Sequence, residues 1–221
     1  MYFYILIMKL KVLFLQLDYE LDKQHITLKE CLPTLNEYDS LDYLDFINEK
    51  NREREKHLNN IEANQPTITN TITNTTALIN DNYIKNDYYT KIKLDEIDFY
   101  KPRNFDAYLI IWNSNKFSTI HNHAERGCIF KILTGSLIET RYQKDTLNEL
   151  GTSLLYSGSS SYIDNNQGLH KVGSDDKNNL TISLHIYAPK NYIPEHYDII
   201  ENLNVNQNVN QNVNQNTSFY A

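Results

Sequence analysis

Residues 180–187, LTISLHIY, constrain the fold most, because apolar and polar side chains alternate along them without a break. Successive side chains of a β-strand point to opposite faces, so the even positions form one aliphatic face. The other face carries Thr181, Ser183, His185 and Tyr187. On an exposed strand these polar groups would form an ordinary solvated face, and inside a barrel they would form a hydrogen-bonded row. The pattern predicts a strand and leaves the two settings open.

Four further segments have the composition of short strands. They are rich in β-branched or aromatic residues, and turn signals such as Gly135 and Ser157-Gly158 separate them. They are residues 108–112, 128–133, 137–142 and 153–156. Many short strands with frequent turns predict a mainly β domain, built as a sandwich or a barrel.

The chain before this β region is expected to be helical. Leu10, Leu13, Phe14, Leu17 and Leu21 recur at helical spacing, and a second helix is expected from residue 41. The apolar residues 1–8 are interpreted as a packed segment, with a membrane-targeting role, or a true start at residue 8, as the alternatives.

Composition divides the chain into four parts. Residues 1–60 are expected to form a helical segment that packs on a β domain at residues 83–200. Residues 61–82 are a low-complexity insertion rich in Asn and Thr, and residues 201–221 are an Asn/Gln-rich tail that is expected to be disordered.

Three histidines make the strongest chemical signal. His121 and His123 lie two apart, so an extended strand would point both imidazoles to the same side. His170 follows Gly168, whose freedom at positive φ allows a tight turn that brings the imidazole inward. Three imidazoles suit zinc, copper, iron or nickel, so the residues alone predict a mononuclear metal site with an open side.

Charge and cysteine content argue against several classes of protein. The formal net charge is −7 and no basic cluster occurs, which argues against nucleic-acid binding. Cys31 and Cys128 are the only cysteines, too few for a disulfide framework or a zinc finger. We expect a cytoplasmic monomer that acts on small molecules, without a nucleic-acid or membrane partner.

The histidine motifs resemble those of a known family. HNHAERGCIFKILTG at residues 121–135 resembles the first metal motif of the cupin superfamily, and YIDNNQGLHKV around His170 resembles the second. Most cupins have a metal-binding glutamate where this chain has Cys128. That exchange, together with YKPRN and SLHIYAP in the same order, is similar to cysteine dioxygenase of type I. The resemblance covers residues 100–189 and implies a cupin, a small double-stranded β-barrel or jelly roll, with N-terminal helices.

The resemblance also implies an activity and a set of roles. It implies Fe(II) held by His121, His123 and His170, and the conversion of L-cysteine and O2 to cysteine sulfinate, a catabolic step toward taurine and sulfate. It implies a thioether cross-link between Cys128 and Tyr187. Ser183 and His185 match a hydrogen-bonded relay to Tyr187, which makes these three residues the expected catalytic groups.

Substrate binding is assigned by the same resemblance. Arg103 matches the carboxylate-binding arginine of the family, and a guanidinium can grip a carboxylate at two points. Tyr100 matches a tyrosine of the same pocket, although the family's tyrosine-x-arginine has one residue more here. The family's cysteine near the pocket mouth is missing, with three candidates for its replacement. They are Tyr192, Pro194 and Glu195.

Two alternatives remain beside cysteine oxidation. The chain could oxidise another small thiol, such as 3-mercaptopropionate or cysteamine, or it could be a non-catalytic metal-binding cupin that acts as a sensor. Arg103 argues against cysteamine, which has no carboxylate. Cys128 favours cysteine over 3-mercaptopropionate, since relatives that use the latter commonly have glycine there. The polar row from Ser183 to Tyr187 is hard to explain in a sensor.

Overall fold

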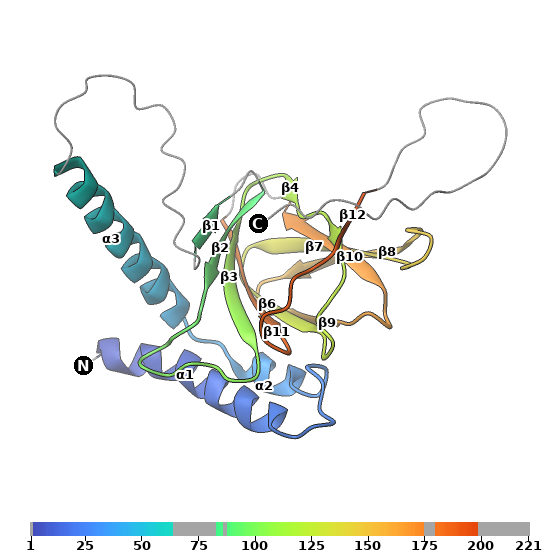
Figure 1. Ribbon diagram of the computed structural model, residues 1–221, viewed down its shortest axis with the longest axis horizontal. Coiled ribbons are helices and arrows are strands. Elements are labelled where there is room, and N and C mark those ends of the chain that lie inside the picture. Colours follow the sequence, from blue (N-terminus) through green and yellow to red (C-terminus); the bar gives the residue numbers. More distant parts are fainter. Residues whose placement is uncertain (1, 64–82, 86–87, 175–179, 199–221) are drawn as a thin grey trace, which may run out of the picture.

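The computed structural model describes residues 2–63, 83–85, 88–174 and 180–198. Three helices come first, and strands follow (Figure 1). The helices are α1 (Tyr2–Leu21), α2 (Leu32–Glu37) and α3 (Asp42–Ala63). The strands are β1 (Tyr83–Lys85), β2 (Tyr89–Lys93), β3 (Asp106–Trp112), β4 (Lys116–Phe117), β5 (Ile120–His121), β6 (Cys128–Thr134), β7 (Ser136–Tyr142), β8 (Glu149–Tyr156), β9 (Ser160–Ile163), β10 (Leu169–Ser174), β11 (Thr181–Tyr187) and β12 (His196–Tyr197). The low-complexity character expected for residues 61–82 and 201–221 falls almost entirely outside the described residues.

The strands form two antiparallel sheets. The first has the order β1-β2-β3-β11-β6-β9, and the second has the order β12-β5-β10-β7-β8 with β4 paired to β10. Strands that are neighbours in a sheet are often distant in sequence, as β3 and β11 are, so the two sheets are wound together rather than built one after the other. This topology is that of a small double-stranded β-barrel.

The helices cover the outer face of the first sheet. Leu10, Leu13, Phe14, Leu17 and Leu21 of α1 are all buried, as their helical spacing predicts. They belong to the same apolar cluster as the even positions of β11 from Ile182 to Ile186. Figure 1 shows α1 and α2 against the barrel, while α3 leads away from it. The aliphatic face of β11 therefore packs on the helices.

The polar face of β11 consequently points into the barrel. A second apolar cluster lies between the sheets, and its members come from both: Ile110, Trp112, Phe130, Ile132, Leu137 and Val172. Ser183 and His185 are buried beside it. Of the two settings that the alternation left open, the enclosed one is found.

A buried lysine and a partly buried arginine connect the helical segment to the barrel. The Lys131 ammonium, on β6, donates hydrogen bonds to the carbonyls of Leu35, Asn36 and Tyr38 at the end of α2. The Arg126 guanidinium donates to the carbonyls of Leu21, Lys23 and Ile26 after α1. Carbonyls at a helix end lack partners within the helix, so these cations satisfy them.

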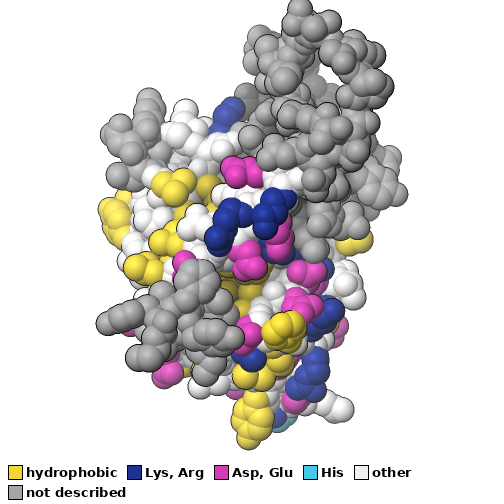
Figure 2. All heavy atoms as spheres, turned by 90° about the vertical axis from the view of Figure 1, so that its left-hand side faces the viewer, with side chains coloured by type: hydrophobic (Ala, Val, Ile, Leu, Met, Phe, Trp, Pro, Cys, Tyr) yellow, Lys and Arg dark blue, Asp and Glu magenta, His cyan; other side chains and the backbone are white. Residues whose placement is uncertain are grey.

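The surface carries mixed charge. Figure 2 shows Lys and Arg side chains beside Asp and Glu on one face of the molecule, without a large basic patch. Within the described residues, no helix combines the length and apolarity that crossing a membrane requires.

Candidate metal centre and pocket

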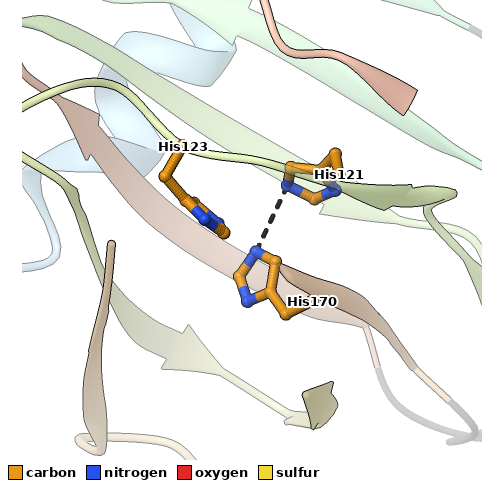
Figure 3. Close-up of side chains that lie close together, drawn as sticks. All are labelled: His121, His123 and His170. Atoms are coloured by element: carbon orange, nitrogen blue, oxygen red, sulfur yellow. Dashed lines mark hydrogen bonds between the residues drawn. The ribbon is translucent and has the colours of Figure 1, made fainter. Parts of the chain in front are cut away.

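Three histidines from separate segments meet at one point. His121 is the last residue of β5, His123 lies in the loop after it, and His170 lies on β10. β5 and β10 are paired with His170 opposite His121, which sets two of the imidazoles side by side. One ring nitrogen from each histidine lies within 4.8 Å of the others (Figure 3). The structure brings together the three residues that the motifs predicted.

Hydrogen bonds fix which nitrogen faces the centre. His170 Nδ1 lies 2.8 Å from Glu139 Oε1, and His121 Nδ1 lies 3.0 Å from the carbonyl oxygen of Thr119. Both partners accept, so both Nδ1 atoms carry the proton and both Nε2 atoms present a lone pair. These Nε2 atoms lie 3.2 Å apart. Two lone pairs facing each other repel, so this arrangement needs a cation between them.

The third histidine is left without a hydrogen-bond partner of good geometry. His123 is 1% exposed, and both of its ring nitrogens are buried and unpaired among the described residues. Unpaired buried nitrogens cost free energy unless a ligand binds them. Asn165 holds the His123 backbone with two hydrogen bonds, of 2.9 Å and 2.8 Å.

The electrostatics keep the imidazoles neutral, as metal ligands must be. Burial lowers the pKa of His121 to about 4 and holds the pKa values of His123 and His170 well below the ordinary range. Nitrogens 3.2 Å apart, each at a metal–nitrogen distance of roughly 2.1 Å, subtend an angle of about 100° at a shared ion. His121 and His170 therefore fit one bound metal ion, and a ring nitrogen of His123 lies within 4.8 Å of theirs.

Glu139 is a buried partner that the sequence analysis missed. It lies on β7 and is 2% exposed. Its second oxygen, Oε2, accepts hydrogen bonds from Ser161 Oγ at 2.8 Å and from Arg141 at 3.3 Å. Such a carboxylate orients the ligating ring and raises its basicity. The detectable signal was an acidic residue at a buried position of a strand.

The metal centre opens into a pocket between the two sheets. His121 and His170 line it from the second sheet. The first sheet contributes Tyr89, Lys91, Tyr108 and Tyr187. Burial lowers the pKa of Lys91 to about 8, so its ammonium is mostly charged at neutral pH. The cation in this pocket is a lysine on β2.

The prediction that Arg103 and Tyr100 line the pocket is therefore wrong. Arg103 is 63% exposed and pairs with Asp22 at 2.9 Å, while the Tyr100 hydroxyl donates to the buried Asp18. Neither residue lines the pocket. Asp18 on α1 and Asp22 just after it hold these side chains beside the helix. Tyr89-Thr90-Lys91 has the tyrosine-x-cation spacing of the family, which residues 100–103, YKPR, lack. This spacing is the signal that could have indicated Lys91 from the sequence.

The predicted relay residues lie in a row beside the pocket. Trp112 Nε1 donates to Ser183 Oγ at 2.8 Å, and Ser183 Oγ lies 2.8 Å from His185 Nε2. The Tyr187 hydroxyl lies 3.5 Å from His185 Nδ1, a long contact. Burial holds the pKa of His185 well below its ordinary range, so its imidazole is neutral.

Cys128 and Tyr187 lie opposite each other on paired strands. β6 and β11 have Cys128 in register with Tyr187, which places the two side chains next to each other across the strand pair. Burial raises the pKa of both groups, so the thiol and the phenol are protonated. The pair proposed for the thioether is brought together in its uncross-linked form.

The pocket mouth is formed by the segment after β11. Two of the three candidates to replace the missing cysteine, Tyr192 and Pro194, line the pocket. His196, which was not singled out from the sequence, lines it as well. Glu195 does not line it. Its carboxylate instead accepts a hydrogen bond of 2.9 Å from Asn122, between the two histidines of β5 and its loop.

Two antiparallel sheets that enclose three inward-facing histidines define a metal-binding cupin. The model of the family "Cysteine dioxygenase type I" matches residues 66–199. The chain therefore belongs to the cysteine dioxygenase type I family, as its motifs predicted.

Curated relatives agree with this membership. Cysteine dioxygenase type 1 of Danio rerio is 29% identical over 107 residues, which is 46% of this chain and 51% of that protein. The Bos taurus and Homo sapiens proteins of that name are both 28% identical over 90 residues, which is 38% of this chain and 45% of theirs. The chain thus spans about half the length of the curated relatives it matches.

Among solved structures, oxalate decarboxylase from Bacillus subtilis at pH 4.6 is similar, with a TM-score of 0.42 at 13% identity. The match covers 52% of this chain and 29% of that one.

Proposed function

We propose that the protein is an Fe(II)-dependent dioxygenase that adds both atoms of O2 to the sulfur of L-cysteine, giving cysteine sulfinate. One observation carries the proposal: three neutral imidazoles meet at one point, and two of them line the same pocket as a lysine ammonium. Membership of the cysteine dioxygenase type I family supports the same reaction. In this reaction the thiol loses its proton and two S–O bonds form, so no other co-substrate is needed.

His121, His123 and His170 are the proposed ligands. When bound, iron supplies the redox chemistry that lets dioxygen react with a thiolate, which zinc cannot supply. The protein's own part is to hold three neutral imidazoles on one side and leave the opposite side open to the pocket. Glu139 keeps the His170 ring in one tautomer.

Lys91 is the proposed partner of the substrate carboxylate, in place of Arg103. Its ammonium lies in the pocket, and a buried cation attracts a carboxylate strongly. Unlike a guanidinium, an ammonium is a point charge that makes no fixed two-point contact. This difference supports a second candidate substrate, 3-mercaptopropionate, which shares the thiol and the carboxylate but lacks the amine.

Tyr187 is proposed to direct its hydroxyl toward the substrate, with His185 and Ser183 holding the phenol. Its cross-link to Cys128 would form a bond between Sγ and a ring carbon, with loss of two hydrogens to dioxygen. The register of β6 with β11, which sets Cys128 opposite Tyr187, supports this pairing.

The test is oxygen uptake by protein loaded anaerobically with Fe(II), with sulfinate identified by mass spectrometry. L-cysteine is expected to give one sulfinate per O2 consumed, and cysteamine, which lacks a carboxylate, to react far more weakly. The His170→Ala variant should lose iron and activity together. Tight iron binding without O2 uptake for any of the three thiols would instead indicate the sensor.

A further inference from the structure

The Lys91 side chain ends between two aromatic rings rather than beside a carboxylate. Its Nζ lies 3.9 Å from the ring centroid of Tyr108 and 5.6 Å from that of Tyr187. Among the residues that the structure describes, Lys91 forms no ion pair, whereas Lys93 on the same strand pairs with Asp106 at 3.1 Å. The charge of Lys91 is therefore held near the pocket without being neutralised.

Strand register explains how the cation meets these rings. β2 and β3 pair Lys91 with Ile110 and Lys93 with Tyr108, so Lys91 and Tyr108 are diagonal neighbours on one face. Diagonal neighbours in a sheet are within reach of long and aromatic side chains. The Tyr108 and Tyr187 rings meet edge to face, with centroids 5.9 Å apart at 72°. Together the rings form a corner that the ammonium occupies.

The two tyrosines differ in what their hydroxyls do. The Tyr187 hydroxyl lies 3.5 Å from His185 Nδ1, and Tyr187 is paired with Cys128 across the strands, which gives it a separate role. For Tyr108, no hydrogen bond of the hydroxyl is found among the described residues. Its ring face is nearest to the Lys91 Nζ, at 3.9 Å, whereas the Lys93 Nζ lies 6.0 Å from the same ring centroid. A ring face attracts a cation electrostatically and most strongly where water is displaced.

We propose that Tyr108 is the positioning residue that holds the Lys91 ammonium in place for the carboxylate of the substrate, an inference that rests on the proposed function. A lysine has a flexible four-carbon stem and no fixed geometry of its own. The Tyr108 ring restricts where the Lys91 charge can lie. It thereby supplies part of the fixed geometry that the planar guanidinium of an arginine would have by itself. Tyr108 thereby contributes to the selection of thiols that bear a carboxylate.

The test compares Tyr108→Phe, which keeps the π face, with Tyr108→Leu, which removes it. For Tyr108→Leu, the KM for L-cysteine is expected to rise about tenfold with kcat and iron content little changed, because cation–π attraction in a partly desolvated site is of that order. Tyr108→Phe should stay within about twofold of the wild type. The KM for cysteamine, which has no carboxylate to place, should not move.

Tyr19→Leu is the matched control. Tyr19 is 69% exposed on α1, and the Lys23 ammonium lies 5.4 Å from its ring centroid. This variant removes a cation–π pair far from the pocket and should leave every kinetic constant unchanged. An unchanged KM for L-cysteine in Tyr108→Leu would overturn the proposal. So would an equal loss in Tyr108→Phe, or an equal rise for cysteamine.

A readout without turnover separates this inference from the proposed function. The protons beside the Lys91 ammonium should show upfield ring-current shifts by NMR, which persist in Tyr108→Phe and disappear in Tyr108→Leu. The Lys91→Arg variant identifies the signals by their loss. Ordinary shifts for Lys91 in the wild type would refute the contact, whichever thiols are oxidised. A wild type with shifted signals that oxidises no thiol would refute the proposed function instead.

Discussion

The carboxylate behind His170 offers the sharpest test of the metal centre. In Glu139→Gln one carboxylate oxygen becomes an amide NH2 group, and the charge is lost. If the remaining oxygen faces His170 Nδ1, the NH2 group meets the Arg141 guanidinium, which only donates. If the amide is flipped, its NH2 group meets the His170 N–H. In either orientation one charge-assisted contact is replaced by two donors facing each other.

The expected loss of metal affinity follows from this geometry. Replacing a hydrogen-bonded partner of a ligating histidine typically costs 10- to 100-fold in affinity. Since Glu139→Gln keeps one acceptor and nearly the same volume, we expect a value near tenfold, or about 1.4 kcal/mol. A loss nearer 100-fold should apply to Glu139→Ala, which leaves the His170 N–H without its acceptor in a buried site.

The assay is an anaerobic Fe(II) titration against a competing chelator, with circular dichroism to check the fold. Glu149→Gln is the control, because Glu149 is exposed on β8 and accepts one hydrogen bond, of 2.9 Å, from Thr152. The Fe(II) dissociation constant of the Glu149→Gln variant should equal that of the wild type. A folded Glu139→Gln variant with unchanged Fe(II) affinity would show that the Glu139 carboxylate does not support His170 as a ligand.

Three further predictions concern the substrate side of the pocket. By steady-state kinetics, Lys91→Ala should raise the KM for L-cysteine at least tenfold, whereas Arg103→Ala should change it less than about twofold. The reverse order would restore Arg103 as the carboxylate partner. Since the pKa of Lys91 is about 8, its charge is present below that pH and lost above it, so the ratio of kcat/KM between the wild type and Lys91→Arg should fall as the pH rises through about 8. A flat ratio would mean that the Lys91 charge does not bind substrate. Protein that has turned over should contain a species that mass spectrometry shows to be two mass units lighter. The Cys128→Ala variant should never form this species, although it should keep partial activity. A free Cys128 thiol after many turnovers would exclude the cross-link to Tyr187.

The elements with a regular pattern were predictable from the sequence. The alternation of residues 180–187 predicted β11, and the helical spacing from Leu10 to Leu21 predicted the buried face of α1. β2 was missed because the face that carries Tyr89, Lys91 and Lys93 has the composition of a solvated face, although Tyr89 and Lys91 line the pocket. A strand that turns lysines toward a pocket gives no apolar signal on that side.

The same difficulty explains the misassigned cation. Local sequence shows that Arg103 follows a tyrosine, but it does not show that Asp18 and Asp22, more than eighty residues earlier, draw that side chain to α1. Glu139 was missed for a related reason, since its partner His170 lies on another strand and only the register of β7 with β10 brings them together. Contacts set by register are not readable from a single stretch of chain.

Most of the proposed metal ligands and the proposed substrate-binding cation come from different sheets. Two of the three proposed metal ligands, His121 and His170, come from the second sheet, whereas Lys91 and Tyr108 come from the first. Facing sheets pack roughly 10 Å apart, and the imidazoles and the lysine stem extend into that space from opposite sides. Little room is left between a metal ion on one side and the ammonium on the other. A substrate that touches both must therefore be short, with a metal-binding thiol at one end and an anion only a few bonds away, and a three-carbon thiol acid such as L-cysteine meets that requirement.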